Sequence, residues 1–153
     1  MIFREATRQD LPVVLALLAD DGTERAGVSG AHERAFAAIE ADVRNELLVL
    51  VDADEVVGCL QLTYVPGLGQ GGRERALVEA VRIRADRRGD GLGAELMRLA
   101  VERARGRGCG LVQLTSNKRR GAAHRFYERL GFARSHEGFK LHLGQDPDQH
   151  PEP

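Results

Sequence analysis

Residues 87–94 read Arg-Arg-Gly-Asp-Gly-Leu-Gly-Ala and combine three closely spaced glycines with two arginines. A strand-like segment precedes them, and a helical pattern begins near Gly91. The first N–H groups of a helix lack partners and carry a partial positive charge, so they attract anions. Glycine lets an oxygen approach the backbone closely, and arginine pairs with phosphate. The stretch therefore predicts a phosphate-binding loop.

This loop fits neither of two common phosphate-binding motifs. The Gly-Lys-Ser/Thr ending of a P-loop is absent. A G-x-G-x-x-G pattern that starts at Gly89 meets Ala94 at its last position, and no acidic ribose partner follows in an obvious βαβ unit. Taken alone, the stretch is also compatible with a glycine-rich turn that only joins a strand to a helix.

Residues downstream of the loop narrow its meaning. Asn117 follows a strand-like segment, and residues 123–132 read Ala-His-Arg-Phe-Tyr-Glu-Arg-Leu-Gly-Phe. The loop, the asparagine, the tyrosine and the Gly-Phe pair resemble the GNAT acetyltransferase superfamily in their order and spacing. The order of predicted elements also resembles that fold over roughly residues 1–143. The resemblance implies an acyl-CoA-dependent N-acyltransferase that uses acetyl-CoA as its co-substrate.

The resemblance also implies how acetyl-CoA binds. Backbone amides of residues 88–94 would hold the pyrophosphate, and the pantetheine would run beside residues 81–83 as an added strand. In this family the sheet splays apart at that strand, which often carries a bulge. Many members have Lys or Arg where this chain has Asp90, so we expect backbone contacts and the two arginines to matter more here. The predicted cofactor-binding residues are Val81, Ile83, Arg87, Arg88, Gly89, Asp90, Gly91, Leu92, Gly93, Ala94 and Asn117.

Two residues are the predicted catalytic groups. By resemblance, Tyr127 is the general acid that protonates the departing thiolate, and Glu79 is the base that acts on the amine directly or through water. A carboxylate within a strand also needs a physical reason, because burying it unpaired is unfavourable. The alternatives are that Tyr127 only packs under the cofactor and that Glu79 forms an ion pair with Arg82, Arg84 or a loop arginine. For His124 and His136 we expect surface or packing roles.

The predicted reaction is direct attack of a small molecule's primary amine on acetyl-CoA in a ternary complex. The family resemblance assigns acceptor choice to residues 22–36 and 65–76. Both segments carry mixed charges, which disfavours a polycationic acceptor. The C-terminal quarter alone resembles the aminoalkylphosphonate N-acetyltransferase branch, which implies an amine that bears an anion. Two alternatives remain open: a non-catalytic acyl-CoA-binding or sensing module, and acetylation of a protein lysine or N-terminus.

One α/β domain over residues 1–143 must position these groups. Strands are predicted at residues 1–5, 46–51, 56–64, 75–84 and 111–115, with a closing strand or hairpin at 132–143. Helices are predicted at 11–20, from Ser29 or Gly30 to Ile39, at 92–104 and at 119–129, with Thr7 and Asp10 capping the first helix. Gly106 and Gly108 should end the third helix, and Gly131 should cap the fourth. These elements predict a GNAT-like fold whose mixed, mostly antiparallel central sheet splays at the cofactor strand and is flanked by about four helices.

Composition excludes several other classes. The 153 residues suit one domain, and a net charge of −1 argues against nucleic acid or an anionic membrane as a partner. The N-terminus lacks a signal-peptide pattern, and no apolar run is long enough to cross a bilayer.

Cys59 and Cys109 are expected to be inert thiols, and no metal-ligand spacing is present. We therefore expect a cytoplasmic protein without a metal or a disulfide. Homodimers are common in the family, although no segment indicates an interface. A tail at residues 144–153 is expected to be disordered.

Overall fold

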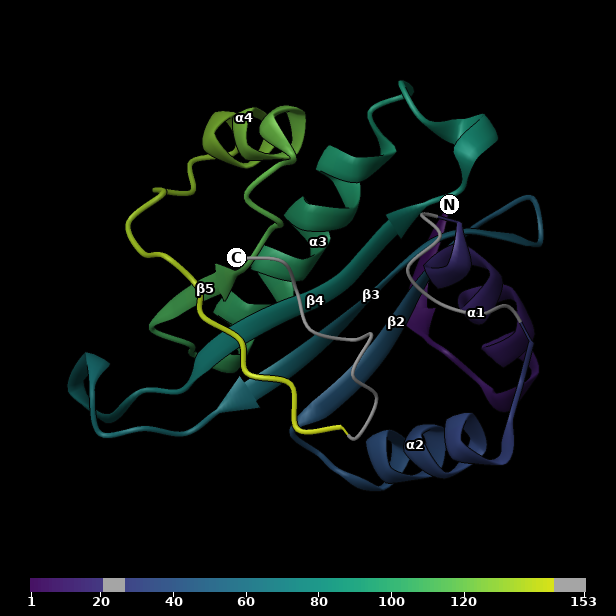
Figure 1. Ribbon diagram of the computed structural model, residues 1–153, viewed down its shortest axis with the longest axis horizontal. Coiled ribbons are helices and arrows are strands. Elements are labelled where there is room, and N and C mark those ends of the chain that lie inside the picture. Colours follow the sequence, from purple (N-terminus) through teal and green to yellow (C-terminus); the bar gives the residue numbers. More distant parts are fainter. Residues whose placement is uncertain (21–26, 145–153) are drawn as a thin grey trace. The chain divides into compact units, whose positions relative to one another are not determined.

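The strands of the central sheet lie within residues 1–114, one of two units of the chain; the other spans residues 115–153. The computed structural model describes residues 1–20 and 27–144. The strands are β1 (Ile2–Glu5), β2 (Asn45–Asp52), β3 (Glu55–Val65), β4 (Arg75–Ile83) and β5 (Leu111–Leu114). They lie in the order β1-β2-β3-β4-β5, and every neighbouring pair is antiparallel except β4 with β5 (Figure 1). The predicted mixed, mostly antiparallel sheet is confirmed.

Four α-helices occur in the described part of the chain, as predicted. They are α1 (Leu11–Ala19), α2 (Gly30–Ala41), α3 (Leu92–Arg107) and, in the second unit, α4 (Gly121–Arg129). Short 3-10 helices η1 (Arg8–Asp10), η2 (Gln70–Gly72) and η3 (Ala85–Arg87) connect other elements. None of the helices in the described ranges is long and apolar enough to span a membrane.

A capping network fixes the entry to α1. The Asp10 carboxylate accepts hydrogen bonds from the Thr7 backbone N–H at 2.7 Å and from an Arg4 guanidinium nitrogen at 2.7 Å. The hydrogen bond from Arg4 is the main reason that the pKa of Asp10 is lowered. Ser29 caps α2 in a similar way, since its hydroxyl accepts from the His32 backbone N–H. Both predicted helix starts are confirmed.

Helices α1 and α2 cover one face of the sheet. Val49 of β2 and Cys59 of β3 are fully buried, and they belong to a core cluster with Val14 and Leu17 of α1. Phe36 of α2 joins a neighbouring cluster with other α1 residues. Because strand side chains alternate between faces, these contacts leave the even-numbered positions within 46–50 of β2 and 58–64 of β3 for the opposite face. A register shift after Leu50 places Val56 in the α1 cluster.

Helix α3 packs on that opposite face. The Tyr64 hydroxyl donates to the Glu46 carboxylate at 2.5 Å, and Arg103 of α3 donates to the same carboxylate at 2.7 Å. Arg107 of α3 lies 4.0 Å from the centre of the Tyr64 ring and pairs with Glu74 at 3.0 Å. Burial opposes ionisation of Glu46, but the bonds from Arg103 and Tyr64 leave its pKa lowered. This network holds the C-terminal half of α3 against the sheet.

Three predictions about the ends of elements have different outcomes. Gly131 has φ +98° and its N–H donates to the Glu128 carbonyl at 3.0 Å, which confirms its role as the cap of α4. Helix α3 continues through Gly106, and Gly108 alone ends it, with φ +86°. The prediction that Gly106 also stops the helix is therefore wrong.

The predicted closing strand or hairpin at 132–143 is also wrong, because these residues form no strand. Phe139, Leu141 and Leu143 do alternate with polar residues, yet their exposed fractions are 91%, 82% and 90%. Alternation makes a strand only where a neighbour supplies backbone hydrogen bonds, and the structure pairs this segment with no other.

Some predictions lie partly or wholly outside the described residues. Helix α1 ends at Ala19, slightly before the predicted end. Half of the predicted loop at 23–30, including part of the first acceptor segment, is not described. The predicted tail at 144–153 is described only at Gly144.

Candidate active site

Strand β4 contains a bulge at Ala80. The register between β3 and β4 shifts between Cys59 and Gln61, and Ala80 has φ +56°. A residue with a Cβ strongly disfavours this left-handed region, at a cost of about 1–2 kcal/mol. The Cys59 thiol donates to the Ala80 carbonyl at 3.6 Å and so supports the bulge. The bulge expected from the family resemblance is thus present.

Beyond the bulge, one edge of β4 is open within the sheet. Pairing with β5 ends at Val78. The Arg84 N–H donates to the Val57 carbonyl of β3 at 2.8 Å. Since successive backbone groups of a strand point to opposite edges, the N–H groups of Val81 and Ile83 point away from β3, toward the edge that β5 no longer covers. These are the two strand residues predicted to contact the cofactor.

The glycine loop leads into the N-terminus of α3. Gly89 and Gly91 have φ +89° and +80°, and Gly91 is the N-cap of the helix. A Cβ at either position would meet nothing within 4 Å, so glycine is required by backbone conformation and not by crowding. The first hydrogen bond of the helix runs from the Glu95 N–H to the Gly91 carbonyl. The N–H groups of residues 92–94 therefore have no partner within the helix.

Both loop arginines already face carboxylates. Arg87 lies 2.9 Å from Asp52 and 3.5 Å from Asp90, and the hydrogen bond to Asp52 is the main cause of its raised pKa. Arg88 lies 2.5 Å from Asp20. A phosphate in the loop would compete with these acids for the guanidinium groups. The carboxylates thus offset the positive charge of both arginines. The backbone N–H groups at the start of α3 therefore provide the remaining attraction for an anion.

Glu79 lies on the exposed side of β4, directly opposite Gln61 of β3. Over residues 1–20 and 27–144, Glu79 forms no ion pair. Arg84, one of the partners considered from the sequence, pairs instead with Glu55 at 3.1 Å and Asp86 at 2.6 Å. Arg84 is therefore not the partner of Glu79.

Two further residues lie on the same face: Asn45, which no pattern in the sequence indicated, and Arg75, which lies in the predicted acceptor segment 65–76. Asn45 of β2 accepts hydrogen bonds through Oδ1 from Thr63 Oγ1 at 2.8 Å and from Gln61 Nε2 at 3.4 Å. Arg75 lies four residues before Glu79 on β4, so both side chains leave the same face. Among the described residues, Arg75 has no carboxylate partner within 4.0 Å. An asparagine that pairs with another amide across two strands forms no pattern that spacing alone would reveal.

Asn117 belongs to the second unit, where it shapes the approach to α4. Its side-chain oxygen accepts from the Arg119 N–H at 3.0 Å, and its backbone carbonyl accepts from the Arg120 N–H at 3.0 Å. A ring nitrogen of His124 lies 2.9 Å from the same carbonyl. These bonds form a turn, so α4 begins at Gly121 and not at the predicted position 119. They also give His124 the packing role expected of it.

Tyr127 lies half-buried on α4 and is held by aromatic contacts. Its ring meets that of Phe126 edge-on at 5.2 Å between centroids, and that of Phe132 at 6.0 Å. Phe132 follows the Gly131 cap, and its N–H donates to the Tyr127 carbonyl at 3.1 Å. The Gly-Phe pair therefore fixes the orientation of the tyrosine ring.

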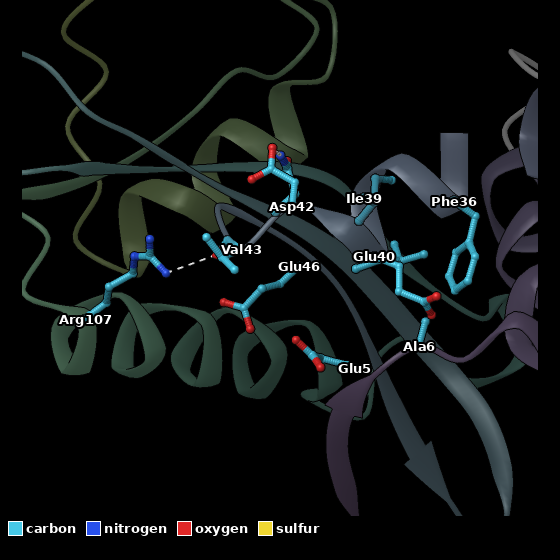
Figure 2. A pocket seen from close by; sticks show the side chains of 11 residues that line it. Glu5, Ala6, Phe36, Ile39, Glu40, Asp42, Val43, Glu46 and Arg107 are labelled. Carbon is cyan, nitrogen blue, oxygen red and sulfur yellow. Dashed lines mark hydrogen bonds between the residues drawn. The ribbon is translucent and has the colours of Figure 1, made fainter. Parts of the chain in front are cut away.

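A pocket of about 350 Å³ lies at the start of β2 and the end of α2. Figure 2 shows carboxylates around it, with Arg107 at one side. Glu46 in this lining is held by Tyr64 and Arg103. None of the predicted site residues lines the pocket. Its lining residues are Glu5, Ala6, Phe36, Ile39, Glu40, Asp42, Val43, Asn45, Glu46, Leu47 and Arg107.

The two cysteines are free thiols. Burial raises the pKa of Cys59 to about 12, and burial also raises the pKa of Cys109. Both thiols therefore disfavour the thiolate form that acts as a nucleophile. In the described portion of the chain, no three His, Cys, Asp or Glu side chains gather as a metal site would require.

Comparison with known proteins agrees with this geometry. Residues 12–132 match the acetyltransferase (GNAT) family. The aminoalkylphosphonate N-acetyltransferase of Salmonella typhimurium is 32% identical over 136 residues, which cover 89% of this chain and 87% of that protein. A crystal structure of a transcriptional regulator from Bacillus halodurans is 44% identical, covers 93% of this chain and 99% of its own, and has a TM-score of 0.89.

A Trypanosoma brucei acetyltransferase structure is 29% identical and covers 93% of this chain and 99% of its own, with a TM-score of 0.79. These matches confirm the fold and the class of enzyme predicted from the sequence. The glycine loop, the bulged strand and the tyrosine helix all lie inside the matched segment. The chain belongs to the acetyltransferase (GNAT) family.

Proposed function

We propose that this protein transfers an acetyl group from acetyl-CoA to the primary amine of a small molecule, by direct attack while both substrates are bound. One observation carries the proposal. Strand β4 presents Glu79, a carboxylate with no ion-pair partner among the described residues, just before the bulge, and then leads through an open edge into the helix N-terminus that attracts anions.

The residues present suit acetyl-CoA. The N–H groups of residues 92–94 and the positive-φ glycines 89 and 91 suit a pyrophosphate. The N–H groups of Val81 and Ile83 suit an extended pantetheine chain, in the way that an added strand pairs with a sheet edge. Asn117 would contact the same arm. Bound acetyl-CoA supplies an activated thioester carbonyl.

Two side chains would move the protons. Glu79 takes one proton from the acceptor ammonium, so that a neutral amine with a free electron pair attacks the carbonyl carbon. The C–N bond forms as the C–S bond breaks, and Tyr127 donates its phenolic proton to the departing sulfur. The amide nitrogen loses its second proton to solvent, Glu79 releases the proton that it took, and Tyr127 regains one proton from solvent. Acetylation thus ends with an amide, free CoA thiol and an unchanged protein.

The state of the cysteines supports direct attack over an acetyl-enzyme. A covalent route would need a thiolate within reach of the thioester. Cys59 is fully buried, donates to the Ala80 carbonyl and has a pKa raised to about 12. Cys109 also has a raised pKa. Neither thiol is activated in the way that a nucleophilic cysteine requires.

The charges on β4 favour an acceptor that carries an anion as well as an amine. Glu79 can hold the ammonium, and Arg75 on the same face can pair with a phosphonate or carboxylate. Their Cα atoms are about 13 Å apart at 3.3 Å per strand residue. The Arg75 guanidinium lies near Gly67 and would have to turn toward Glu79 to shorten that gap. The relative from Salmonella typhimurium acetylates aminoalkylphosphonates, and this chemistry fits such a pair of charges.

The test combines binding with turnover. Calorimetry should show that acetyl-CoA binds, and release of free thiol should be followed over a panel of aminoalkylphosphonates, amino acids, polyamines and a lysine peptide. We expect thiol release with at least one small primary amine, strongest where the amine bears an anion. Arg75→Gln should raise KM for that amine and leave KM for acetyl-CoA unchanged. Binding of acetyl-CoA without thiol release on any amine would contradict the proposal.

A further inference from the structure

We infer that Gln61 is an acceptor-binding residue, whose side-chain carbonyl oxygen holds the substrate ammonium beside Glu79, and that Asn45 and Asp42 are the positioning residues that orient it. The inference rests on the proposed function, because it concerns the amine acceptor of that reaction. It starts from three hydrogen bonds on the face of the sheet that carries Glu79.

The register of the sheet places Gln61 beside Glu79. Gln61 and Glu79 are direct partners across β3 and β4, so their side chains leave the same face with Cβ atoms about 5 Å apart. Asn45 and Thr63 are direct partners across β2 and β3 on that same face. Gln61 therefore lies between a polar network on the β2 side and a carboxylate on the β4 side.

The directions of the hydrogen bonds determine the orientation of the Gln61 amide. Asn45 Nδ2 donates to the Asp42 carboxylate at 3.0 Å. A carboxylate can only accept, so it directs the amide nitrogen of Asn45 toward itself and the oxygen toward β3. That oxygen accepts from Thr63 at 2.8 Å and from Gln61 Nε2 at 3.4 Å. The charge of Asp42 thus determines which end of the Gln61 amide faces β2.

Asp42 is itself well suited to anchor this chain of bonds. The Arg44 backbone N–H donates to its carboxylate at 2.8 Å. This bond, together with the one from Asn45, lowers the pKa of Asp42. The anchor consequently stays ionised, and an ionised anchor keeps the amide of Asn45 in one orientation.

The groups that remain at the surface beside Gln61 and Glu79 are hydrogen-bond acceptors. With its nitrogen turned to β2, the planar amide of Gln61 directs its oxygen to the β4 side, where Glu79 lies. Two hydrogen-bond acceptors then stand side by side, and in the described residues no cation pairs with Glu79. Such a pair is complementary to a group with several N–H donors and a positive charge, as a primary ammonium has.

The test uses the primary amine with the highest turnover in the panel and its N,N,N-trimethyl analogue as a dead-end inhibitor. Both carry a positive charge, but only the primary amine has N–H groups. We expect Gln61→Leu to raise KM for the amine about tenfold, the typical effect of one lost hydrogen bond. KM for acetyl-CoA and the inhibition constant of the trimethyl analogue should not change. Gln9→Leu, which removes an exposed amide from η1, is the control.

Exchanging the side chains of residues 42 and 45 tests their role as positioning residues. Asn45→Asp removes the donor to Asp42 and sets two carboxylates against each other, so KM for the amine should rise. The double variant Asp42→Asn/Asn45→Asp restores a donor at position 42 and an acceptor toward Gln61, so it should recover most of the wild-type KM. A purely structural role for the network predicts instead that the double variant is at least as impaired as the single one.

The outcomes separate this inference from the function on which it rests. No turnover of any primary amine by the wild-type protein would overturn both. Turnover with an unchanged amine KM in Gln61→Leu would overturn only the role of Gln61. Equal weakening of the amine and the trimethyl analogue would do the same, since it indicates general damage to the site.

Discussion

Gln61 and Glu79 are register partners across β3 and β4, and the regular pairing of these strands is interrupted at the next residue, Ala80. The carboxylate therefore occupies the last regular position before the bulge. Beyond the bulge the outer edge of β4 is open, and the strand leads through η3 into the glycine loop. One strand thus joins the proposed acceptor side to the proposed donor side.

Replacing Glu79 should remove the base. Glu79→Gln keeps the size of the side chain but cannot take a proton from the ammonium. We expect kcat/KM to fall about 100-fold or more and the acidic limb of the pH–rate profile to disappear. Initial rates at several pH values measure both. Glu102→Gln, on the exposed side of α3, is the control and should keep wild-type rates. An unchanged profile in Glu79→Gln would rule out the role of base.

Replacing Tyr127 should remove the acid without disturbing α4. Tyr127→Phe keeps the ring that packs against Phe126 and Phe132. We therefore expect a protein that still folds, with a cooperative melting transition, and a kcat lowered about 100-fold. Thermal unfolding and turnover, measured on the same preparation, check the two parts. Wild-type kcat in Tyr127→Phe would mean that the tyrosine only packs.

A pair of glycine variants isolates the backbone geometry of the loop. Gly91 has φ +80°, whereas Gly106 is within α3 and has no such conformation; a Cβ at either would meet nothing within 4 Å. Gly91→Ala should cost about 1 kcal/mol of unfolding free energy and raise the dissociation constant of acetyl-CoA. Gly106→Ala should stabilise by about 0.5–1 kcal/mol and leave binding unchanged. Denaturant unfolding measures the stability of each variant, and calorimetry measures its affinity for acetyl-CoA. Equal effects of the two substitutions on both quantities would contradict this prediction.

The cap at the start of α1 should make stability depend on pH. Asp10 has a lowered pKa, mainly because Arg4 donates to it. The contribution of the Asp10 carboxylate to the free energy of unfolding is complete above its unfolded-state pKa of about 3.9. This contribution is lost as the pH falls through the lower folded-state pKa. Asp10→Asn should cost about 1 kcal/mol at pH 7, and the difference from wild type should shrink at pH 3. A difference that stays constant over this range would contradict the assignment.

Much of the fold follows from local signals in the sequence. Gly131 has positive φ at the end of α4, where the sequence predicts a glycine cap. Thr7 and Asp10 form the predicted capping network because its parts lie three residues apart. Such features depend on neighbours in the chain, so spacing alone reveals them.

Long-range partners could not be predicted in this way. Arg88 pairs with Asp20 and Arg87 with Asp52, so the loop arginines are less free than the sequence suggests. The contact of Gln61 with Asn45 depends on the register between β2 and β3. For residues 132–143 the sequence predicted a strand that is not present. Apolar and polar residues alternate there, but no neighbouring strand pairs with the segment.

The most direct test of the account is the product of a single reaction. The purified protein is incubated with acetyl-CoA and the amine with the highest turnover in the panel, and mass spectrometry follows the acetylated amine while a thiol reagent follows CoA. We predict equal amounts of N-acetyl product and free CoA, no acetylated protein, and no CoA release without the amine. CoA release without acetylated amine, or an acetyl group retained on the protein, would contradict direct transfer to an amine.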